Sequence, residues 1–241
     1  MNTKSFKSLA AVITLSASVI SGVANAGLID RGNGLIYDDV LDVTWLQNAN
    51  LSGTRMTWSD SVTWANNLDY GGFDDWRLTK VYDEGDDGCN TSYTGTDCGY
   101  NVNSSFTDGN GDTFFSELAY MFHENLGNVD YFDTNGNPQT GWNSVNISFT
   151  DGVTGNSVSF ENLDRTGYWS GTESATVNGL SWSFSTHGGY QGLAGGDDRY
   201  AWAVRDGDVA TQVVSEVPEP TSIAIFTLGL LGLTMRARQR R

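Results

Sequence analysis

The chain has little positive charge, cysteine, proline or histidine. Its 241 residues include 13 Lys and Arg against 29 Asp and Glu, with two cysteines, three prolines and two histidines. So acidic a protein repels nucleic acid and anionic lipid, which excludes nucleic acid as a partner. Two cysteines are too few for a structural zinc site.

Catalytic signatures are missing as well. The sequence has no G-x-S-x-G nucleophile elbow, no phosphate loop and no dinucleotide-binding fingerprint. His123 has no second histidine at helical metal-binding spacing and His187 lies in a loop, so we expect neither to be a catalytic base. Paired carboxylates hydrolyse glycosides in many enzymes, but 29 acidic residues single out no pair. We therefore predict that the protein is not an enzyme.

The N-terminus has the pattern of a secretory signal peptide, which we assign to residues 1–26. Lys4 and Lys7 precede an apolar stretch at residues 9–20, and residues 24–26 read Ala-Asn-Ala, a typical cleavage site. The apolar stretch is too short to span a membrane comfortably; an N-terminal anchor helix is the alternative. We expect cleavage after Ala26.

Residues 27–208 have the length of a single domain with a sizeable core. All 29 acidic residues lie between positions 27 and 220, and only seven of the 13 basic residues do, which leaves the exported part with a net charge near −22. This charge suits either a well-solvated extracellular protein or one that binds divalent cations through oxygen ligands.

The two cysteines predict a disulfide. Cys89 and Cys98 are close in sequence, and export places them in an oxidising compartment. The bond would close a short loop and stabilise the fold by about 2–3 kcal/mol in the chain-entropy description. Two free thiols are the alternative.

The segment DGNGDTFFSE is the best candidate for a cation site. Asp108, Asn110 and Asp112 stand at alternating positions, as in the front half of a calcium-binding loop. The last ligand position falls on Ala119 instead of a carboxylate. The segment is therefore either an irregular Ca²⁺ loop or a turn that caps a helix, and no other cofactor is expected.

Two segments predict helices. Residues 57–68 place their apolar side chains on one face and begin with a capping box of Thr57 and Asp60. Residues 112–127 carry an apolar, largely aromatic stripe and end at Gly127.

The rest of residues 27–208 predicts short strands and turns. Asp151-Gly152 and Asn178-Gly179 each stand between two short apolar runs, as in a β-hairpin. Residues 199–207 predict one last strand with Trp202 facing inward. We expect a compact α+β domain with two helices, short antiparallel strands and long Gly-, Asn- and Asp-rich loops. Eight tryptophans would supply much of its core.

Four stretches, in this order, resemble the Lcl C-terminal domain family: residues 32–50, 74–83, 168–173 and 200–207. The chain departs from that family at Thr79, where members usually have Pro, and at Ala203, where they often have Cys. The resemblance implies a C-type-lectin-like fold, and some members resemble adhesins that bind sulfated polysaccharides. The residues that carry the match are Asp75, Trp76, Arg77, Tyr168, Trp169, Ser170 and Arg205.

The matching residues also have a reading from their own chemistry. With few basic residues available, Arg77 and Arg205 are expected to form ion pairs that tie loops to a sheet. Tyr168, Trp169 and Ser170 predict a strand that packs into the core. Stacking of a sugar on Trp169 is the alternative.

The C-terminal segment differs from everything before it. After a linker at residues 209–216 come Val217, Pro218, Glu219 and Pro220, then an apolar run at residues 222–235 and four arginines. As a helix the run is about 21 Å long, which is short for a bilayer core of about 30 Å.

Residues 217–241 resemble the PEP-CTERM sorting signal of Gram-negative bacteria. The resemblance implies transient anchoring in the inner membrane, processing by an exosortase, and delivery to the cell surface or extracellular matrix. An ordinary C-terminal anchor is the alternative.

Together these features predict an exported, non-enzymatic binding or adhesion module at the surface or in the matrix. Its ligand would be a polysaccharide or another envelope component, with or without Ca²⁺. A secreted hydrolase that uses loop carboxylates and a purely structural matrix component remain as alternatives.

Overall fold

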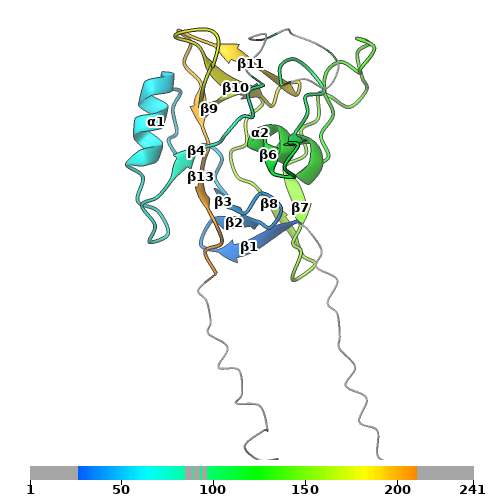
Figure 1. The fold of residues 1–241 in the computed structure, drawn as a ribbon. Helices are drawn as coiled ribbons and strands as arrows, with labels where there is room; N and C mark the ends of the chain where they lie inside the picture. The colour runs from blue at the N-terminus through cyan, green and yellow to red at the C-terminus, as the bar shows by residue number, and fades with distance from the viewer. Residues whose placement is uncertain (1–26, 85–88, 90–92, 94–96, 211–241) are drawn as a thin grey trace, which may run out of the picture.

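The computed structural model describes residues 27–84, 89, 93 and 97–210 (Figure 1). The expected signal peptide, the sorting segment and most of the linker before it lie outside the described residues. No helix in the described part is long and apolar enough to cross a membrane.

A five-stranded antiparallel sheet forms the end of the domain where the described chain begins and ends (Figure 1). The first three strands form a meander, and the last strand of the described residues inserts beside the third. In spatial order the strands are β1 (Leu28–Gly32), β2 (Leu35–Asp38), β3 (Val43–Leu46), β13 (Ala203–Asp206) and β4 (Arg77–Leu78).

A four-stranded sheet forms the other end. Its strands are, in spatial order, β11 (Tyr190–Ala194), β10 (Ser181–Ser185), β9 (Gly167–Glu173) and β12 (Tyr200–Ala201), with β12 parallel to β9. Two separate hairpins complete the strands of the described part: β5 (Ser105–Thr107) with β6 (Thr113–Phe115), and β7 (Ser148–Thr150) with β8 (Ser157–Ser159).

The predicted first helix is present as α1 (Trp58–Asn66). Thr57 caps it, because its hydroxyl oxygen accepts the backbone N–H of Asp60 at 3.2 Å. The hydroxyl in turn donates to the Asp60 carboxylate at 2.8 Å. The predicted N-cap at Thr57 is therefore confirmed, but the Asp60 carboxylate accepts the Thr57 hydroxyl where a capping box would have it accept the Thr57 backbone N–H.

The predicted second helix is wrong in its first third. Residues 113–115 form strand β6, and the helix is limited to α2 (Glu117–Tyr120) and the π-helical turn η1 (Met121–Asn125). The aromatic stripe explains the difference. Phe106 and Phe114 face each other across the β5–β6 pair, and both rings stack on Tyr82. Cross-strand aromatic packing thus outweighs the helical spacing of the same residues.

The expectation of an α+β, C-type-lectin-like domain is also wrong. The described residues contain thirteen strands in four small sheets, and only two short helical stretches. The last predicted strand illustrates the cause. It breaks at Trp202 into β12 and β13, which belong to different sheets.

Trp202 holds the two sheets together at this break. Its indole N–H donates to the Leu46 carbonyl at 2.7 Å, and its ring lies 4.8 Å from Trp45 and 5.0 Å from Phe160. A buried indole with a satisfied N–H fixes the position of both flanking strands. The chain therefore changes sheets here instead of continuing as one strand.

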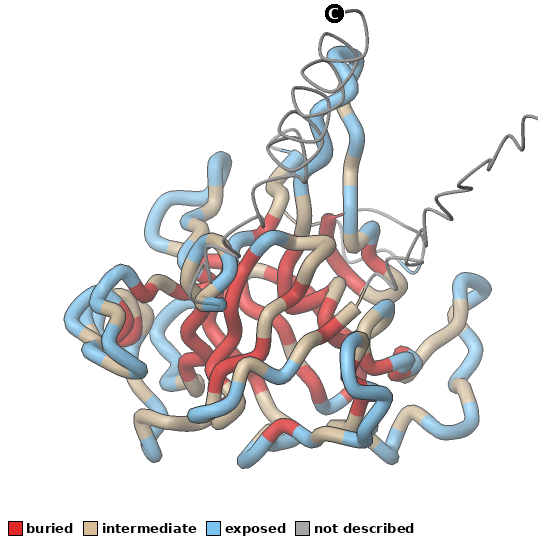
Figure 2. Tube along the Cα trace, turned by 90° about the horizontal axis from the view of Figure 1, so that it is seen from below, coloured by how far each residue is buried: buried red, intermediate tan, exposed pale blue. Residues whose placement is uncertain are grey.

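Tryptophan supplies much of the core, as the composition predicted. Figure 2 shows the buried residues gathered in the middle of the domain, with exposed loops around them. The largest fully enclosed side chains include five tryptophans, none more than 2% exposed: Trp45, Trp76, Trp169, Trp182 and Trp202. Because each buries 150 Å² or more, a loop-rich chain can still build a core.

The hairpin predictions are partly right. β7 and β8 pair around the turn that contains Asp151-Gly152. β9 and β10 pair as well, but Asn178-Gly179 lies inside a longer connection, in a turn closed between Leu180 N–H and the Val177 carbonyl at 3.3 Å.

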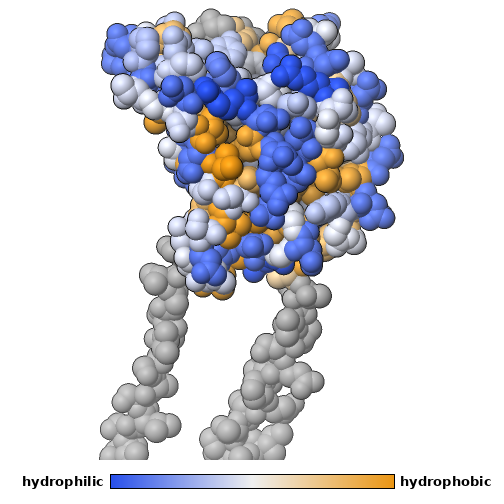
Figure 3. Space-filling model, turned by 180° about the vertical axis from the view of Figure 1, so that it is seen from behind, coloured by the Kyte–Doolittle hydropathy of each residue, from blue (hydrophilic) through white to orange (hydrophobic). Residues whose placement is uncertain are grey.

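The described chain starts and ends at the same end of the domain. Arg31 of β1 holds Asp208 through paired hydrogen bonds of 2.9 and 2.5 Å. β1 lies at the lower end of Figure 1 and β11 at the upper end. On the face seen in Figure 3, the upper end of the domain is largely hydrophilic, while hydrophobic residues gather toward the middle and the lower part.

Candidate functional site

The residues that carry the Lcl resemblance build the fold. Arg77 donates to both oxygens of Glu117 at 2.8 and 2.9 Å and also to Asp206. Arg205 pairs with Asp75 at 2.7 and 2.8 Å. The predicted ion pairs are therefore present, and they tie β4, α2 and the loop before β4 to β13.

The other matching residues are in the core. Trp76, Tyr168, Trp169 and Ser170 are at most 2% exposed. The indole N–H of Trp169 donates to the Met56 carbonyl at 3.0 Å. Packing, the first reading of Trp169 from the sequence, fits this burial.

The candidate calcium residues form the turn between β5 and β6. One oxygen of the Asp108 carboxylate accepts the N–H groups of Asn110 at 2.8 Å and Asp112 at 3.0 Å. These backbone hydrogen bonds lower the pKa of Asp108. The turn joins two strands and does not cap a helix. The helix that follows begins at Glu117.

Through these hydrogen bonds the Asp108 carboxylate binds backbone N–H groups of its own turn. Within the described ranges, no group of three or more His, Cys, Asp or Glu side chains is arranged to hold a metal ion. Calcium binding at Asp108, Asn110 and Asp112 stays a prediction.

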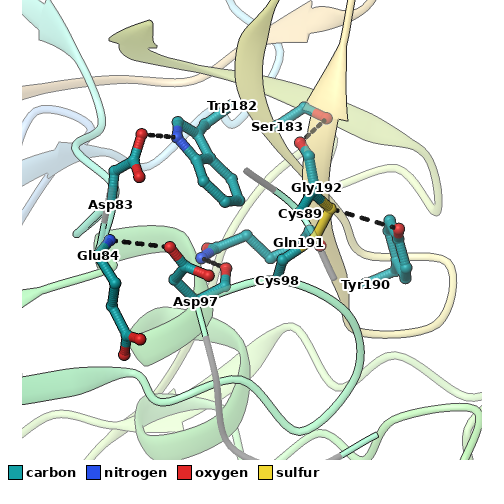
Figure 4. Close-up of a disulfide and its surroundings, with 10 residues drawn as sticks. All are labelled: Asp83, Glu84, Cys89, Asp97, Cys98, Trp182, Ser183, Tyr190, Gln191 and Gly192. Atoms are coloured by element: carbon teal, nitrogen blue, oxygen red, sulfur yellow. Dashed lines mark hydrogen bonds between the residues drawn. A yellow bond between two sulfur atoms is a disulfide. The ribbon is translucent and has the colours of Figure 1, made fainter. Parts of the chain in front are cut away.

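The expected disulfide joins Cys89 and Cys98. Cys98 is completely buried beside Gln191 of β11, whose side-chain N–H donates to the Asp97 carbonyl at 2.7 Å (Figure 4). Gly99 pairs with the backbone of Gln191 in both directions, at 2.8 and 3.0 Å. The disulfide and these bonds fix the residue that follows, Tyr100, against the strand that begins at Tyr190.

Next to this junction lies a pocket of about 380 Å³. It is lined by four aromatic side chains and an imidazole, with Ser185 and Gly188 between them. We call it the aromatic pocket, and its rings are those of Tyr100, Tyr131, Trp142, His187 and Tyr190.

The rings of the aromatic pocket support one another edge to face. Tyr131 lies 4.5 Å from Trp142, Tyr100 lies 5.1 Å from Tyr190, and Trp142 lies 5.5 Å from His187. Contacts of this kind hold aromatic side chains in defined orientations. The tyrosine and tryptophan side chains are half-buried and His187 is exposed, so part of each side chain remains accessible to solvent.

The electrostatics of the aromatic pocket are mild. Burial raises the pKa of Tyr100 and of Tyr190, so both hydroxyl groups stay protonated and can donate hydrogen bonds. The guanidinium of Arg165 lies 5.4 Å from the centre of the Trp142 ring and donates to the His187 carbonyl at 3.3 Å. Among its described lining residues there is no carboxylate.

A second cavity, of about 370 Å³, offers different chemistry. It lies at the start of α1, where Trp58 lines it together with the carboxylates of Glu173 and Asp197. Asp197 faces Arg199 at 3.7 Å. This cavity is where loop carboxylates of the kind expected for a hydrolase meet an aromatic ring.

Sequence reasoning missed the aromatic pocket. Its residues come from two loops and from the β10–β11 hairpin, in three segments without a common periodicity. The amino-acid composition could have indicated it. Tyrosine and tryptophan occur in segments rich in Gly, Asn and Asp, where no strand or helix pattern requires an aromatic side chain.

Comparison with known protein families identifies the C-terminal segment. Residues 216–241 match the model of the PEP-CTERM protein-sorting motif, which confirms the resemblance seen in the sequence. No curated protein and no solved structure matches the chain, so the Lcl resemblance of the domain remains an expectation. The chain thus carries a signal for exosortase-type processing, and it is an exported protein sorted to the cell envelope or surface of a Gram-negative bacterium.

Proposed function

We propose that the domain is a non-enzymatic module that binds neutral polysaccharide at the cell surface or in the extracellular matrix. The observation that carries the proposal is the aromatic pocket. The C–H faces of pyranose rings pack on aromatic side chains, and tyrosine hydroxyls, an imidazole and a serine supply hydrogen bonds to sugar hydroxyls. A largely apolar concave surface with a few polar groups is the usual form of a ligand site.

The charge of the domain selects among polysaccharides. A net charge near −22 on the exported residues disfavours a sulfated or uronic-acid polymer. Arg165 is engaged with Trp142 and the His187 carbonyl, so it offers little compensation. We therefore depart from the sulfated ligands that the Lcl resemblance implies and favour a neutral one.

Binding is favoured over hydrolysis because of what lines the aromatic pocket. Glycoside hydrolysis needs two carboxyl groups across the scissile bond. Such groups line the Trp58 cavity instead, with Glu173 and Asp197. Sugar binding is therefore assigned to the aromatic pocket and hydrolysis to the Trp58 cavity, and one variant in each cavity can distinguish the two functions.

The test is electrophoresis of the purified full chain through gels that contain a polysaccharide. Hydroxyethyl cellulose, soluble starch and galactomannan serve as neutral probes, and dextran sulfate as the anionic one. We expect retardation by a neutral probe, lost in Trp142→Ala and kept in Trp58→Ala, which removes a ring of the same size from the other cavity. Loss of at least about tenfold in affinity corresponds to removal of one stacked ring.

Two results would contradict the proposal. One is retardation that depends on Trp58 and not on Trp142. The other is release of reducing ends from a probe that stops in Glu173→Gln or Asp197→Asn, which would make the protein a hydrolase. Repeating the gels with Ca²⁺ and with a chelator tests the calcium prediction separately, through Asp108→Asn.

A further inference from the structure

The walls of the aromatic pocket meet at one buried carboxylate, that of Asp130. This side chain is 1% exposed. One oxygen lies 2.6 Å from Nε2 of His123, and the other accepts the backbone N–H of Asn101. Removing a carboxylate from water is costly unless hydrogen-bond partners compensate it. The partners therefore fix the position of the Asp130 carboxylate, and the carboxylate in turn fixes the position of its partners.

The third neighbour of Asp130 is Gly189. A Cβ placed on Gly189 would lie 1.5 Å from the Asp130 carboxylate oxygen, so no larger residue fits there without displacing the carboxylate. Gly189 also has a φ of +75°, which favours glycine. The turn between β10 and β11 is therefore shaped to let Asp130 approach its backbone.

Each of these contacts lies one residue from a ring of the aromatic pocket. Asn101 follows Tyr100, Asp130 precedes Tyr131, and Gly189 precedes Tyr190. The backbone N–H of Tyr131 also donates to the Gly188 carbonyl at 2.9 Å. Three segments that are distant in sequence are thus joined by one side chain at the points where they supply tyrosines.

We propose that Asp130, held by His123, is the positioning residue of the aromatic pocket: its carboxylate sets the spacing of Tyr100, Tyr131 and Tyr190. The ligand part of this inference rests on the proposed function. The positioning part does not, because the contacts exist whether or not a sugar binds.

The experiment compares two variants that disturb the junction in different ways. Asp130→Asn removes the charge, and Gly189→Ala pushes the carboxylate away while leaving the charge in place. Their matched controls are Asp151→Asn and Gly155→Ala. Asp151 is a buried carboxylate of the β7–β8 turn, and Gly155 has a φ of +70° with nothing within 4 Å of an added Cβ.

The first readout is amide hydrogen exchange of residues 100–101, 130–131 and 188–190. We expect both junction variants to speed exchange in all three segments at once, by about tenfold or more. The controls reproduce the loss of a buried carboxylate charge and the positive-φ strain, and they should leave exchange in these segments unchanged. Unchanged exchange in Asp130→Asn, or an equal change in Asp151→Asn, overturns the positioning role.

The second readout is retardation by the neutral probe that the wild-type protein binds. We expect at least about tenfold weaker binding in both junction variants and wild-type binding in both controls. If the wild-type chain binds no probe, the proposed function fails, and hydrogen exchange still decides the role of Asp130. If Asp130→Asn does not fold, His123→Ala replaces it with the same expected results, because His123 is partly exposed and its loss removes one partner of the Asp130 carboxylate.

Discussion

The ion pair between Arg77 and Glu117 offers a quantitative test of how this domain is held together. Glu117 is 5% exposed and accepts three hydrogen bonds, two from Arg77 and one from the Lys80 backbone N–H at 2.7 Å. Burial alone would lower the pKa of Arg77, but Glu117 and Asp206 outweigh it and raise the pKa. The guanidinium therefore depends on these two carboxylates.

The substitution Glu117→Gln keeps the shape of the side chain and removes its charge. Breaking a fully buried pair costs about 3–5 kcal/mol. Arg77 retains Asp206 and is 20% exposed, so solvent and the second carboxylate recover part of this cost. We expect a loss of about 2–3 kcal/mol in the free energy of unfolding. For a domain of this length, that is a fall of about 5–10 °C in melting temperature.

Urea unfolding followed by tryptophan fluorescence measures the loss, because five buried tryptophans report on the core. The slope of free energy against urea should stay constant. The exposed Glu161→Gln is the matched control, and we expect it to stay within about 0.5 kcal/mol of wild type. A loss below about 0.5 kcal/mol for Glu117→Gln would refute the reasoning, since the pair would then contribute nothing beyond its packing.

Two further predictions concern the loops. Burial alone would raise the pKa of Asp151, but hydrogen bonds from Thr154, Asp30 and Val153 outweigh it and lower the pKa to about 2. The stability that this carboxylate contributes, about 1–2 kcal/mol, is therefore full above the unfolded pKa near 3.9 and lost as the pH falls toward 2. The difference in unfolding free energy between wild type and Asp151→Asn should narrow across that range, and a constant difference would contradict the assignment. Replacing both Cys89 and Cys98 by Ser should lower the free energy of unfolding by about 2–3 kcal/mol. Relative to the wild-type protein, amide exchange should speed up more at Tyr100 and Tyr190 than at Trp58.

The features that the sequence predicted correctly depend on local chemistry or on the small number of basic residues. Thr57 caps α1 because an N-cap hydrogen bond, here from the Asp60 backbone N–H, joins residues only three positions apart. Arg77 and Arg205 found carboxylate partners because acidic residues surround so few basic ones. The β7–β8 turn formed at Asp151-Gly152 for the same local reason.

The failures were tertiary. Residues 113–115 have the helical spacing that predicted a helix, but the stacking of Phe106 and Phe114 on Tyr82 holds them in strand β6. Trp202 divides a strand because of rings and a carbonyl from segments about 40 and 150 residues earlier. Neither partner is visible in the local pattern.

The aromatic pocket is a stronger case of the same limit. Its rings belong to residues near 100, 131–142 and 187–190, and no single segment has a signature of binding. The pocket exists because a disulfide, a Gly99–Gln191 backbone pair and the Asp130 carboxylate bring these loops together. Each of those links is itself a long-range contact, so the site could not be assembled from local propensities.

The position of the pocket also bears on the sorting signal. The chain leaves the domain beside β1, where Arg31 holds Asp208, whereas Tyr190 begins β11 at the opposite end (Figure 1). The aromatic pocket therefore lies far from the point where the described chain ends, and we predict that removal of the tail changes the location of the protein without changing its binding. We expect equal affinity for the neutral probe in processed protein and in unprocessed protein from cells without the exosortase. A tenfold weaker affinity of the unprocessed form would mean that the tail covers the pocket, and that sorting and binding are coupled.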